Sequence, residues 1–516
     1  MDRSVAQGPD RPVDRLARAV PLTVGVIGFL AARAALQPGV AFWDTAELQA
    51  VAPLMGTAHP TGFPTYVLLG WLASVVFAPL GEPAFRMNLL AAVCLGVAAG
   101  VTTDLVRSLT RSTAMGVLAG IGTALTPMVW RVSTHAEAHA LHLALLAILL
   151  RLLVAWEDRR ANESATADRW LVGATVVFAL AVGNHSLTLL LAIPVGLYVL
   201  AVDPRIFRRP RLVAACLVAL AATLTVVYLE LPLRAGPFRA PLVYGHPETL
   251  EGFLYVVLAE QFRGSLEDPF GDLLGKTLAL ARLAVDQLGP LAALLPAAFL
   301  VTALRRPRYA LLTGSAALIT CFFAASYVNA DIDRYYAGPL LIAWTWLAFL
   351  GRALADALAD LFDPRRRRSW MTLLAGALVV ALALAPTALA LPRRFAAVDE
   401  RRNVAAADWL DHVLSVMEED ALIVSWWSYS TPLWYAQLVE GRRPDLAIVD
   451  DRTRLDENLG DFTDVIDANL GKRPVYVIRN DPREVALLAD RYELEYIDGV
   501  DAFKLTRVLG LKASAS

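Results

Sequence analysis

Long apolar runs separated by short polar segments make up most of the chain between residues 20 and 390. A helix that crosses the hydrocarbon core of a bilayer needs about 20 mainly apolar residues. The pattern predicts eleven spanning helices, near 20–37, 88–106, 114–129, 139–156, 170–183, 186–202, 211–231, 289–304, 309–327, 338–358 and 370–390. Because this number is odd, we expect the two ends of the helical part on opposite sides of the membrane.

Arginines gather in alternate segments between these runs. They stand before the first run and after every second one, at Arg11, Arg15, Arg18, Arg107, Arg111, Arg159 and Arg160 and within 205–211, 305–308 and 365–368. Short cytoplasmic loops of membrane proteins retain Lys and Arg. We therefore predict a multi-pass protein of the plasma or cytoplasmic membrane, with a cytoplasmic N-terminus on an uncleaved first span and an extracytoplasmic C-terminal part.

The apolar stretch 64–79 (PTYVLLGWLASVVFAP) resembles a further span. Counting it would move Arg107 and Arg111 to the outer side and reverse every later loop. We therefore interpret this stretch as an interfacial or re-entrant helix on the outer side.

The pattern changes at about residue 393. Short β-rich runs at 421–425, 446–450, 474–479 and 503–508 alternate there with polar helical segments, which is typical of a small α/β domain. The predicted fold is thus mainly α. A polytopic helical bundle at 1–392, with an outer loop at 38–87, precedes an extracytoplasmic α/β domain at 393–516. That domain has no motif to which we can assign chemistry.

Composition agrees with a membrane protein. Hydrophobic residues make up 57% of the chain and charged residues 19%, and the net charge is -2. This charge excludes a globally basic nucleic-acid binder. Cys94, Cys216 and Cys321 lie far apart in apolar runs, so they indicate neither a disulfide framework nor a Cys-rich metal site.

An ionisable residue beside lipid is expensive and is by default a functional candidate. Asp44 and Glu47 follow the first span, and His59 stands a dozen residues later. On a helix that begins near Asp44, the two carboxylates share one face. One interpretation is a solvated helix start, with Asp44 as the N-cap. The other is a partly dehydrated carboxylate that serves as a base.

Three neighbouring segments carry a family pattern: 44–48 (DTAEL), 59–66 (HPTGFPTY) and 85–90 (FRMNLL). Together they resemble the start of the protein O-mannosyltransferase-like family, polytopic membrane proteins among the GT-C glycosyltransferases. The commoner family pattern reads Asp-Ser-Gly-Glu-Phe and His-Pro-Pro-Gly-Tyr-Pro. This chain departs from it at Thr45, Ala46, Thr61 and Phe63 and keeps both carboxylates, the His and the loop Gly.

The resemblance implies a fold whose first outer loop carries an acidic active-site residue and two helices along the membrane surface. It also implies a sugar donor on a polyprenyl phosphate, mannose or a similar hexose as the sugar, and a reaction at the outer face. The acceptor hydroxyl belongs to a protein, a glycan or a lipid. We predict Asp44 as the base, with Glu47 positioning the acceptor or tuning Asp44, in a single displacement that inverts the anomeric centre.

Further polar groups on the outer side are candidates for donor or substrate binding. Arg334 lies in the segment 331–336 (DIDRYY), and a guanidinium offers planar contacts to phosphate; its alternative is a pairing with Asp331 or Asp333. His135, Glu137, His139 and His142 cluster before one span, where a divalent metal is conceivable but polar lining of a cleft is favoured. The complete set of predicted binding residues is His59, Arg86, His135, His139, His185, Asp333, Arg334 and Tyr335.

Two other classes of function remain open. A transporter or flippase of a lipid-linked saccharide would also need apolar spans and outer polar groups, but it predicts ionisable residues near the bilayer midplane. A non-enzymatic polytopic scaffold would not explain why the loop that carries Asp44, Glu47 and His59 places ionisable residues beside lipid. The outer position of the acidic groups favours the enzyme.

Overall fold

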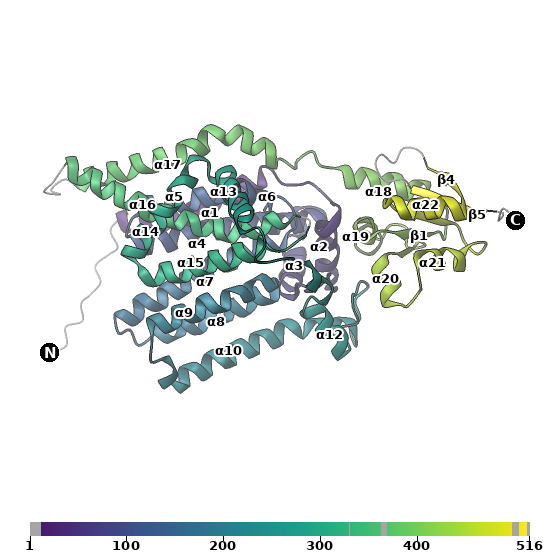
Figure 1. Cartoon of the computed structure of the whole chain (residues 1–516), viewed down its shortest axis with the longest axis horizontal. Helices are drawn as coiled ribbons and strands as arrows, with labels where there is room; N and C mark the ends of the chain where they lie inside the picture. The colour runs from purple at the N-terminus through teal and green to yellow at the C-terminus, as the bar shows by residue number, and fades with distance from the viewer. Residues whose placement is uncertain (1–11, 330, 363–368, 498–504, 513–516) are drawn as a thin grey trace.

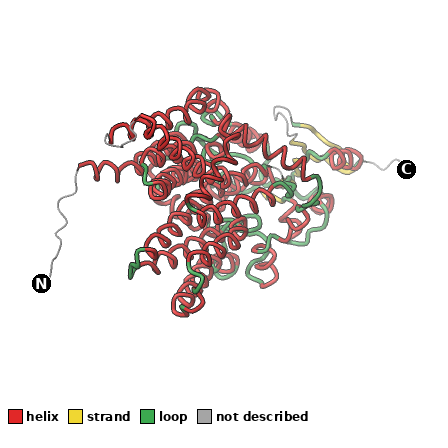
Figure 2. Tube along the Cα trace, turned by 60° about the vertical axis from the view of Figure 1, so that its left-hand side comes forward, coloured by secondary structure: helices red, strands yellow, loops and turns green. Residues whose placement is uncertain are grey.

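The computed structural model describes residues 12–329, 331–362, 369–497 and 505–512. A bundle of long helices occupies most of the molecule, and a smaller part with all the labelled strands lies at one end (Figure 1). The strands form a separate patch next to the helices when the molecule is turned (Figure 2). The predicted fold class, mainly helical with a small C-terminal α/β part, is thus confirmed in these residues.

Each predicted run in the first half of the chain falls on helical structure. The elements are α1 (Pro12–Arg33), α2 (Trp43–Leu54), α3 (Pro64–Val76), η1 (Ala78–Leu80), α4 (Pro83–Thr110), α5 (Thr113–Ala124), α6 (Pro127–Arg131), α7 (Ala138–Ala161), α8 (Ala167–Asn184), η2 (Ser186–Leu191), α9 (Ala192–Val202), η3 (Ile206–Arg208), α10 (Pro210–Tyr228) and α11 (Glu230–Ala235). The run predicted at 114–129 is broken, because Pro127 lacks the N–H that would continue α5 and instead starts α6.

The second half of the bundle contains one long helix that the sequence pattern did not reveal. Its elements are α12 (Leu250–Val257), η4 (Glu260–Ser265), α13 (Leu273–Leu288), η5 (Gly289–Leu294), α14 (Leu295–Arg305), α15 (Pro307–Ala324), η6 (Ile332–Tyr336), α16 (Ala337–Phe362) and α17 (Ser369–Val398). Helix α13 lies between the runs predicted at 211–231 and 289–304. It was missed because its Lys, Arg and Asp residues interrupt the apolar run. Helix α17 continues past the domain boundary predicted at residue 393.

Six helical stretches among the described residues are long and apolar enough to cross a membrane, by length and composition. Shorter apolar helices include 64–76. At about 1.5 Å per residue, the 13 residues of α3 reach roughly 20 Å, less than the roughly 30 Å of a hydrocarbon core. This length favours the interfacial interpretation of 64–79. The number of crossings stays a prediction.

Ion pairs join several of the arginine-rich turns to one another. Arg160 in the last turn of α7 contacts Asp203 after α9 at 2.8 Å. Arg306 before α15 contacts Asp158 in α7 at 3.5 Å. The turn between α9 and α10 and the start of α17 lie at the end of the bundle away from the α/β part (Figure 1). These basic turns therefore gather at one end of the bundle, as the alternation of arginines predicted.

The α/β part contains a five-stranded sheet with the order β2-β1-β3-β5-β4. Strand β1 runs parallel to β2 and β3, and β5 runs antiparallel to β3 and β4. The elements are α18 (Ala405–Val416), β1 (Leu422–Ser425), α19 (Trp427–Trp434), η7 (Tyr435–Val439), β2 (Ala447–Val449), α20 (Asp451–Asp456), α21 (Phe462–Asn469), β3 (Val475–Ile478), α22 (Pro482–Arg491), β4 (Tyr492–Tyr496) and β5 (Leu505–Leu511).

Three of the four predicted strands coincide with β1, β2 and β3. The fourth, 503–508, coincides with β5 from Leu505 onward, and residues 503–504 lie outside the described residues. Strand β4 was missed although its sequence, YELEY, alternates between apolar and charged residues, which is the pattern of a half-buried strand. It forms an edge of the sheet, where one side of the strand remains in contact with solvent.

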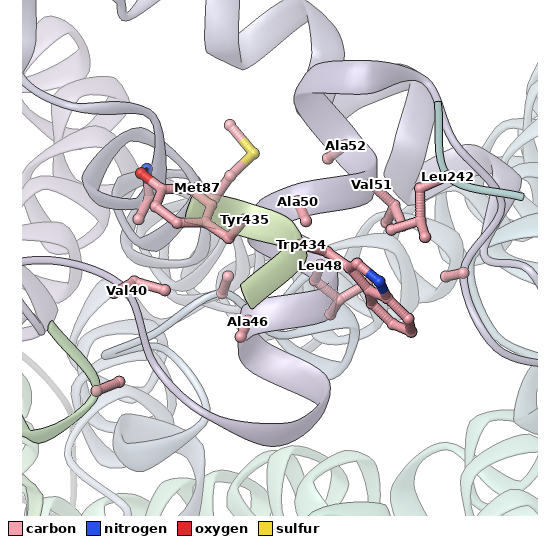
Figure 3. Packing of buried hydrophobic residues seen from close by; sticks show 14 of the residues in the cluster. Val40, Ala46, Leu48, Ala50, Val51, Ala52, Met87, Leu242, Trp434 and Tyr435 are labelled. Atoms are coloured by element: carbon pink, nitrogen blue, oxygen red, sulfur yellow. Dashed lines mark hydrogen bonds between the residues drawn. The ribbon is translucent and has the colours of Figure 1, made fainter. Parts of the chain in front are cut away.

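A shared hydrophobic core fixes helix α2 between the bundle and the α/β part. Trp434 and Tyr435 from the α/β part pack near Leu48 and Val51 of α2 (Figure 3). The Tyr435 hydroxyl also accepts a hydrogen bond from the backbone N–H of Ala84, at 3.0 Å. Helices α2 and α3 also pack closely at Gly70. A side chain at this position would place its Cβ only 2.6 Å from the Cβ of Ala52. These contacts hold α2, which carries Asp44, in a defined place.

Candidate active site

A cavity of about 870 Å³ lies between the bundle and the α/β part. Its wall on the bundle side comes from the first outer loop and from the ends of α7, α8 and η6. Its opposite wall comes from the α/β part, where Trp426, Trp427, Asp451, Arg452 and Leu455 face it. The predicted site residues that line this cavity are Asp44, His59, His135, His139, His185, Arg334 and Tyr335.

Arg334 holds two carboxylates from different parts of the chain. Its Nη2 lies 2.7 Å from Asp44 Oδ2, across 290 residues of sequence, and its Nη1 lies 2.9 Å from Glu137 Oε2. Our alternative interpretation, a pairing of Arg334 with Asp331 or Asp333, is therefore wrong. The guanidinium of Arg334 is largely buried, and it pairs with carboxylates that are also partly or fully buried. Asp333, in contrast, is exposed to solvent.

The role of N-cap that we considered for Asp44 is also wrong. Helix α2 begins at Trp43 with Phe42 as the N-cap residue, and no side chain caps it. Asp44 therefore lies in the first helical turn. Its carboxylate forms an ion pair with Arg334. A charge-assisted hydrogen bond to a partly buried guanidinium is stronger than one to a solvent-exposed backbone N–H.

Glu47 lies behind His59 rather than beside Asp44 in the cavity wall. Its side chain is fully buried, and its Oε1 accepts a hydrogen bond from the backbone N–H of His59 at 2.8 Å. Its Oε2 contacts Nδ1 of the same residue. Burial alone would lower the pKa of His59, but the Glu47 carboxylate outweighs burial and raises this pKa to about 9. His59 is therefore an imidazolium at neutral pH.

The pair of Glu47 and His59 predicts a dependence of stability on pH. A histidine whose pKa is higher in the folded state stabilises that state fully below its unfolded pKa of about 6.5, and this contribution is lost as the pH rises toward 9. We expect the melting temperature of the detergent-solubilised protein to fall over this interval. In Glu47→Gln the fall becomes smaller, because the raised pKa depends on the carboxylate.

Thermal unfolding followed at several pH values between 6 and 9.5 checks this prediction. His59→Asn is the matched control, since it removes the titrating ring and should flatten the same interval. Equal slopes for the wild type and both variants would show that this pair does not set the dependence.

Three rings pack together beside Glu137. The centroids of His139 and His185 lie 4.7 Å apart, and Tyr335 lies 5.1 Å from His139 and 5.4 Å from His185. Glu137 Oε1 lies 2.9 Å from His139 Nδ1, and His139 Nε2 is buried without a hydrogen-bond partner. Burial would raise the pKa of Glu137, but Arg334 and His139 outweigh burial and hold this pKa well below its ordinary value.

The same groups were the candidates for a divalent metal site. Among the described residues, no three His, Cys, Asp or Glu side chains are arranged so that they could hold a metal ion. His142 does not line the cavity, and its Nδ1 lies 3.3 Å from the Thr188 hydroxyl. The other three, His135, Glu137 and His139, line the cavity.

Two predicted binding residues do not reach the cavity wall. Arg86 donates hydrogen bonds to the carbonyl oxygens of Gly81 and Ser74, at 2.7 and 3.1 Å, and so ties together the turn between α3 and α4. Asp333 is exposed on η6. Neither residue is among those that line the cavity.

Sequence reasoning missed the residues that come from the α/β part. Trp426 and Trp427 both line the cavity, and the ring of Trp427 lies 5.7 Å from that of His59. They follow β1, just as Asp451 and Arg452 follow β2. Ligands commonly bind beyond the carboxyl ends of parallel strands, so the ends of these two strands were the available signal.

Comparisons with known proteins agree with the fold and with the family pattern. Residues 44–206 match the family model of the Protein O-mannosyl-transferase TMEM260 N-terminal domain. The protein O-mannosyl-transferase TMEM260 of Mus musculus is 26% identical over 425 residues, which are 79% of this chain and 59% of the mouse protein. The Dictyostelium discoideum protein of the same name is 24% identical over 248 residues, 46% of this chain and 30% of that protein. The chain thus matches less than two thirds of the length of these relatives.

Two solved structures are similar over nearly the whole chain. ArnT from Cupriavidus metallidurans, bound to undecaprenyl phosphate, superposes with a TM-score of 0.57 at 15% identity and covers 96% of this chain and 97% of its own. The oligosaccharyltransferase of Archaeoglobus fulgidus, in complex with Zn and sulfate, gives a TM-score of 0.51 at 13% identity and covers 93% of this chain and 72% of its own.

The fold and the family-model match of residues 44–206 are consistent with each other. The apolar helices and these neighbours show a multi-pass membrane protein. The chain has the fold of these two solved structures, and its residues 44–206 match the N-terminal domain of the TMEM260 protein O-mannosyl-transferase family.

Proposed function

We propose that this protein is a membrane glycosyltransferase that moves a sugar from a polyprenyl-phosphate donor to an acceptor hydroxyl at the outer face of the membrane. The observation that carries this proposal is the direct contact of Asp44 with Arg334 in the wall of one large cavity. A carboxylate that can take a proton and a cation that can hold a phosphate are the two groups that such a transfer needs at one place.

The proposed step is a single displacement. The acceptor oxygen forms a bond to the anomeric carbon while its proton passes to the Asp44 carboxylate. The bond from the anomeric carbon to the phosphate oxygen breaks, and its electron pair leaves with the polyprenyl phosphate. The leaving group departs as an anion, so a cation such as Arg334 helps it more than an acid would. This course inverts the anomeric centre.

His59 and Glu47 add a second positive group to the same wall. The imidazolium of His59 faces the cavity, while Glu47 keeps it charged from behind. Glu47 is therefore a positioning residue that acts through His59, which replaces our prediction that it tunes Asp44 or positions the acceptor. The wall from the α/β part, with Trp426 and Trp427, offers the acceptor a surface opposite Asp44.

The neighbours support the choice of substrates. ArnT was solved with undecaprenyl phosphate, which is a polyprenyl phosphate. The TMEM260 relatives are named protein O-mannosyl-transferases, which favours mannose, or a similar hexose, and a hydroxyl acceptor. We place the cavity outside the cytoplasm, because the arginine-rich turns gather at the other end of the bundle.

An assay in detergent tests this proposal. The purified wild-type protein is incubated with a mannosyl or glucosyl polyprenyl phosphate and a mixture of hydroxyl-bearing peptides, and polyprenyl phosphate release and sugar on the peptide are both measured. We expect stoichiometric release and transfer, because group transfer does not require a sealed bilayer. A flippase would show neither product in detergent and would move the donor only across vesicle membranes.

A further inference from the structure

The guanidinium of Arg334 is already occupied on two sides. Asp44 and Glu137 each bind one of its terminal nitrogens, at 2.7 and 2.9 Å, and its Nε is buried without a hydrogen-bond partner. Each terminal nitrogen keeps a second N–H, but the two carboxylates already more than balance the positive charge of the guanidinium. A phosphate that approaches from the cavity therefore meets a net negative charge, and its contact with Arg334 is stronger when one carboxylate moves away.

The two carboxylates are held with very different strength. Glu137 is buried, caps the start of α7 and also binds the backbone N–H and the ring Nδ1 of His139, at 3.2 and 2.9 Å. Asp44 has 26% of its side chain exposed, and within the described part of the chain Arg334 is its only ion-pair partner. An incoming anion therefore displaces Asp44 more readily than Glu137.

The contact with Arg334 also occupies one carboxylate oxygen of Asp44, Oδ2. This oxygen contacts the guanidinium rather than an acceptor hydroxyl. In the state that the structure shows, the proposed base is thus paired with the proposed phosphate ligand.

We propose that the donor phosphate exchanges with Asp44 on Arg334, and that Glu137 holds the guanidinium in place during this exchange. This inference rests on the proposed function. Before the exchange, the guanidinium bridges two carboxylates; afterwards it bridges Glu137 and the phosphate, and Asp44 is free to face the acceptor hydroxyl. The base thus becomes available only when a donor is bound, which protects the protein from unproductive proton transfer. Glu137 is in this view a positioning residue.

The exchange predicts an unusual property of an inactive variant. Asp44→Asn removes the carboxylate that competes for Arg334 and leaves Glu137 in place. We expect it to bind a short-chain polyprenyl phosphate about tenfold more tightly than the wild type does, measured by titration calorimetry of the purified protein in detergent. Equal or weaker binding by the variant would overturn the exchange.

Two further variants separate this effect from a general change in charge. Asp399→Asn is the matched control, because it breaks the exposed ion pair of Asp399 with Arg401 outside the cavity, and it should leave the affinity unchanged. Glu137→Gln should weaken binding, while Glu137→Asp should recover part of it. Equal tightening in Asp399→Asn would overturn the exchange. A wild type that binds no polyprenyl phosphate and transfers no sugar would instead overturn the proposed function.

Discussion

Asp44→Asn is expected to lower the rate of sugar transfer by roughly 10²–10⁴-fold, the usual contribution of a general base. The amide has almost the shape of the carboxylate, and its oxygen can still accept a hydrogen bond from Arg334, so the fold should be kept. It cannot take a proton from the acceptor hydroxyl. The loss should therefore appear in kcat, while the KM for the donor stays the same or falls.

Initial rates at several donor concentrations measure this split. A melting temperature within a few degrees of the wild type confirms that the variant is folded, and Asp399→Asn again serves as the control for loss of a carboxylate outside the cavity. Transfer at the wild-type rate by folded Asp44→Asn would remove Asp44 from the mechanism, whatever its effect on binding.

Most helices of the bundle could be predicted because each depends on its own stretch of sequence. Burial in lipid requires a local apolar run, and the arginines mark the turns at one end whether or not their partners are known. Asp44, His59 and Arg334 could be singled out for a similar reason, since a charged residue beside an apolar run is conspicuous on its own. Local signals thus identified the helices and several members of the site.

The pairing of these residues could not be predicted, because it depends on contacts between distant segments. The sequence places Asp44 and Glu47 on one helical face, and this spacing suggested that they act together. In the structure, Asp44 contacts Arg334 and Glu47 contacts His59. Each partly buried carboxylate forms an ion pair with the cationic side chain that lies next to it in the folded protein. The spacing of residues along one helix does not predict which side chain that is.

The contribution of the α/β part was hidden for a related reason. Two adjacent tryptophans after a strand are typical of packing, and only the arrangement of the sheet against α2 brings them to His59. The sequence indicated an α/β domain correctly, but not the side of the sheet that faces the bundle. This orientation is set by the packing of Trp434 and Tyr435 on α2. No local sequence pattern predicts this contact.

Arg334→Gln should be the most damaging single change to both stability and transfer. It leaves Asp44 and the buried Glu137 without their shared cation, and removing one partner of a buried ion pair costs about 3–5 kcal/mol. Arg334→Lys keeps the charge, but an ammonium lacks the planar fork that serves two carboxylates or a phosphate. We expect Lys to retain most of the stability and to reduce transfer by roughly 10–100-fold, and Gln to abolish transfer.

Thermal unfolding in detergent and initial rates of transfer measure the two effects separately. The double variant Arg334→Gln with Glu137→Gln tests the cause, because it removes the buried carboxylate along with its cation. It should regain much of the lost melting temperature and none of the transfer, since an unpaired carboxylate explains the instability while the missing guanidinium explains the lost reaction. A double variant as unstable as Arg334→Gln alone would show that Arg334 stabilises the fold through contacts other than Glu137, and full transfer by Arg334→Gln would show that the leaving phosphate needs another cation.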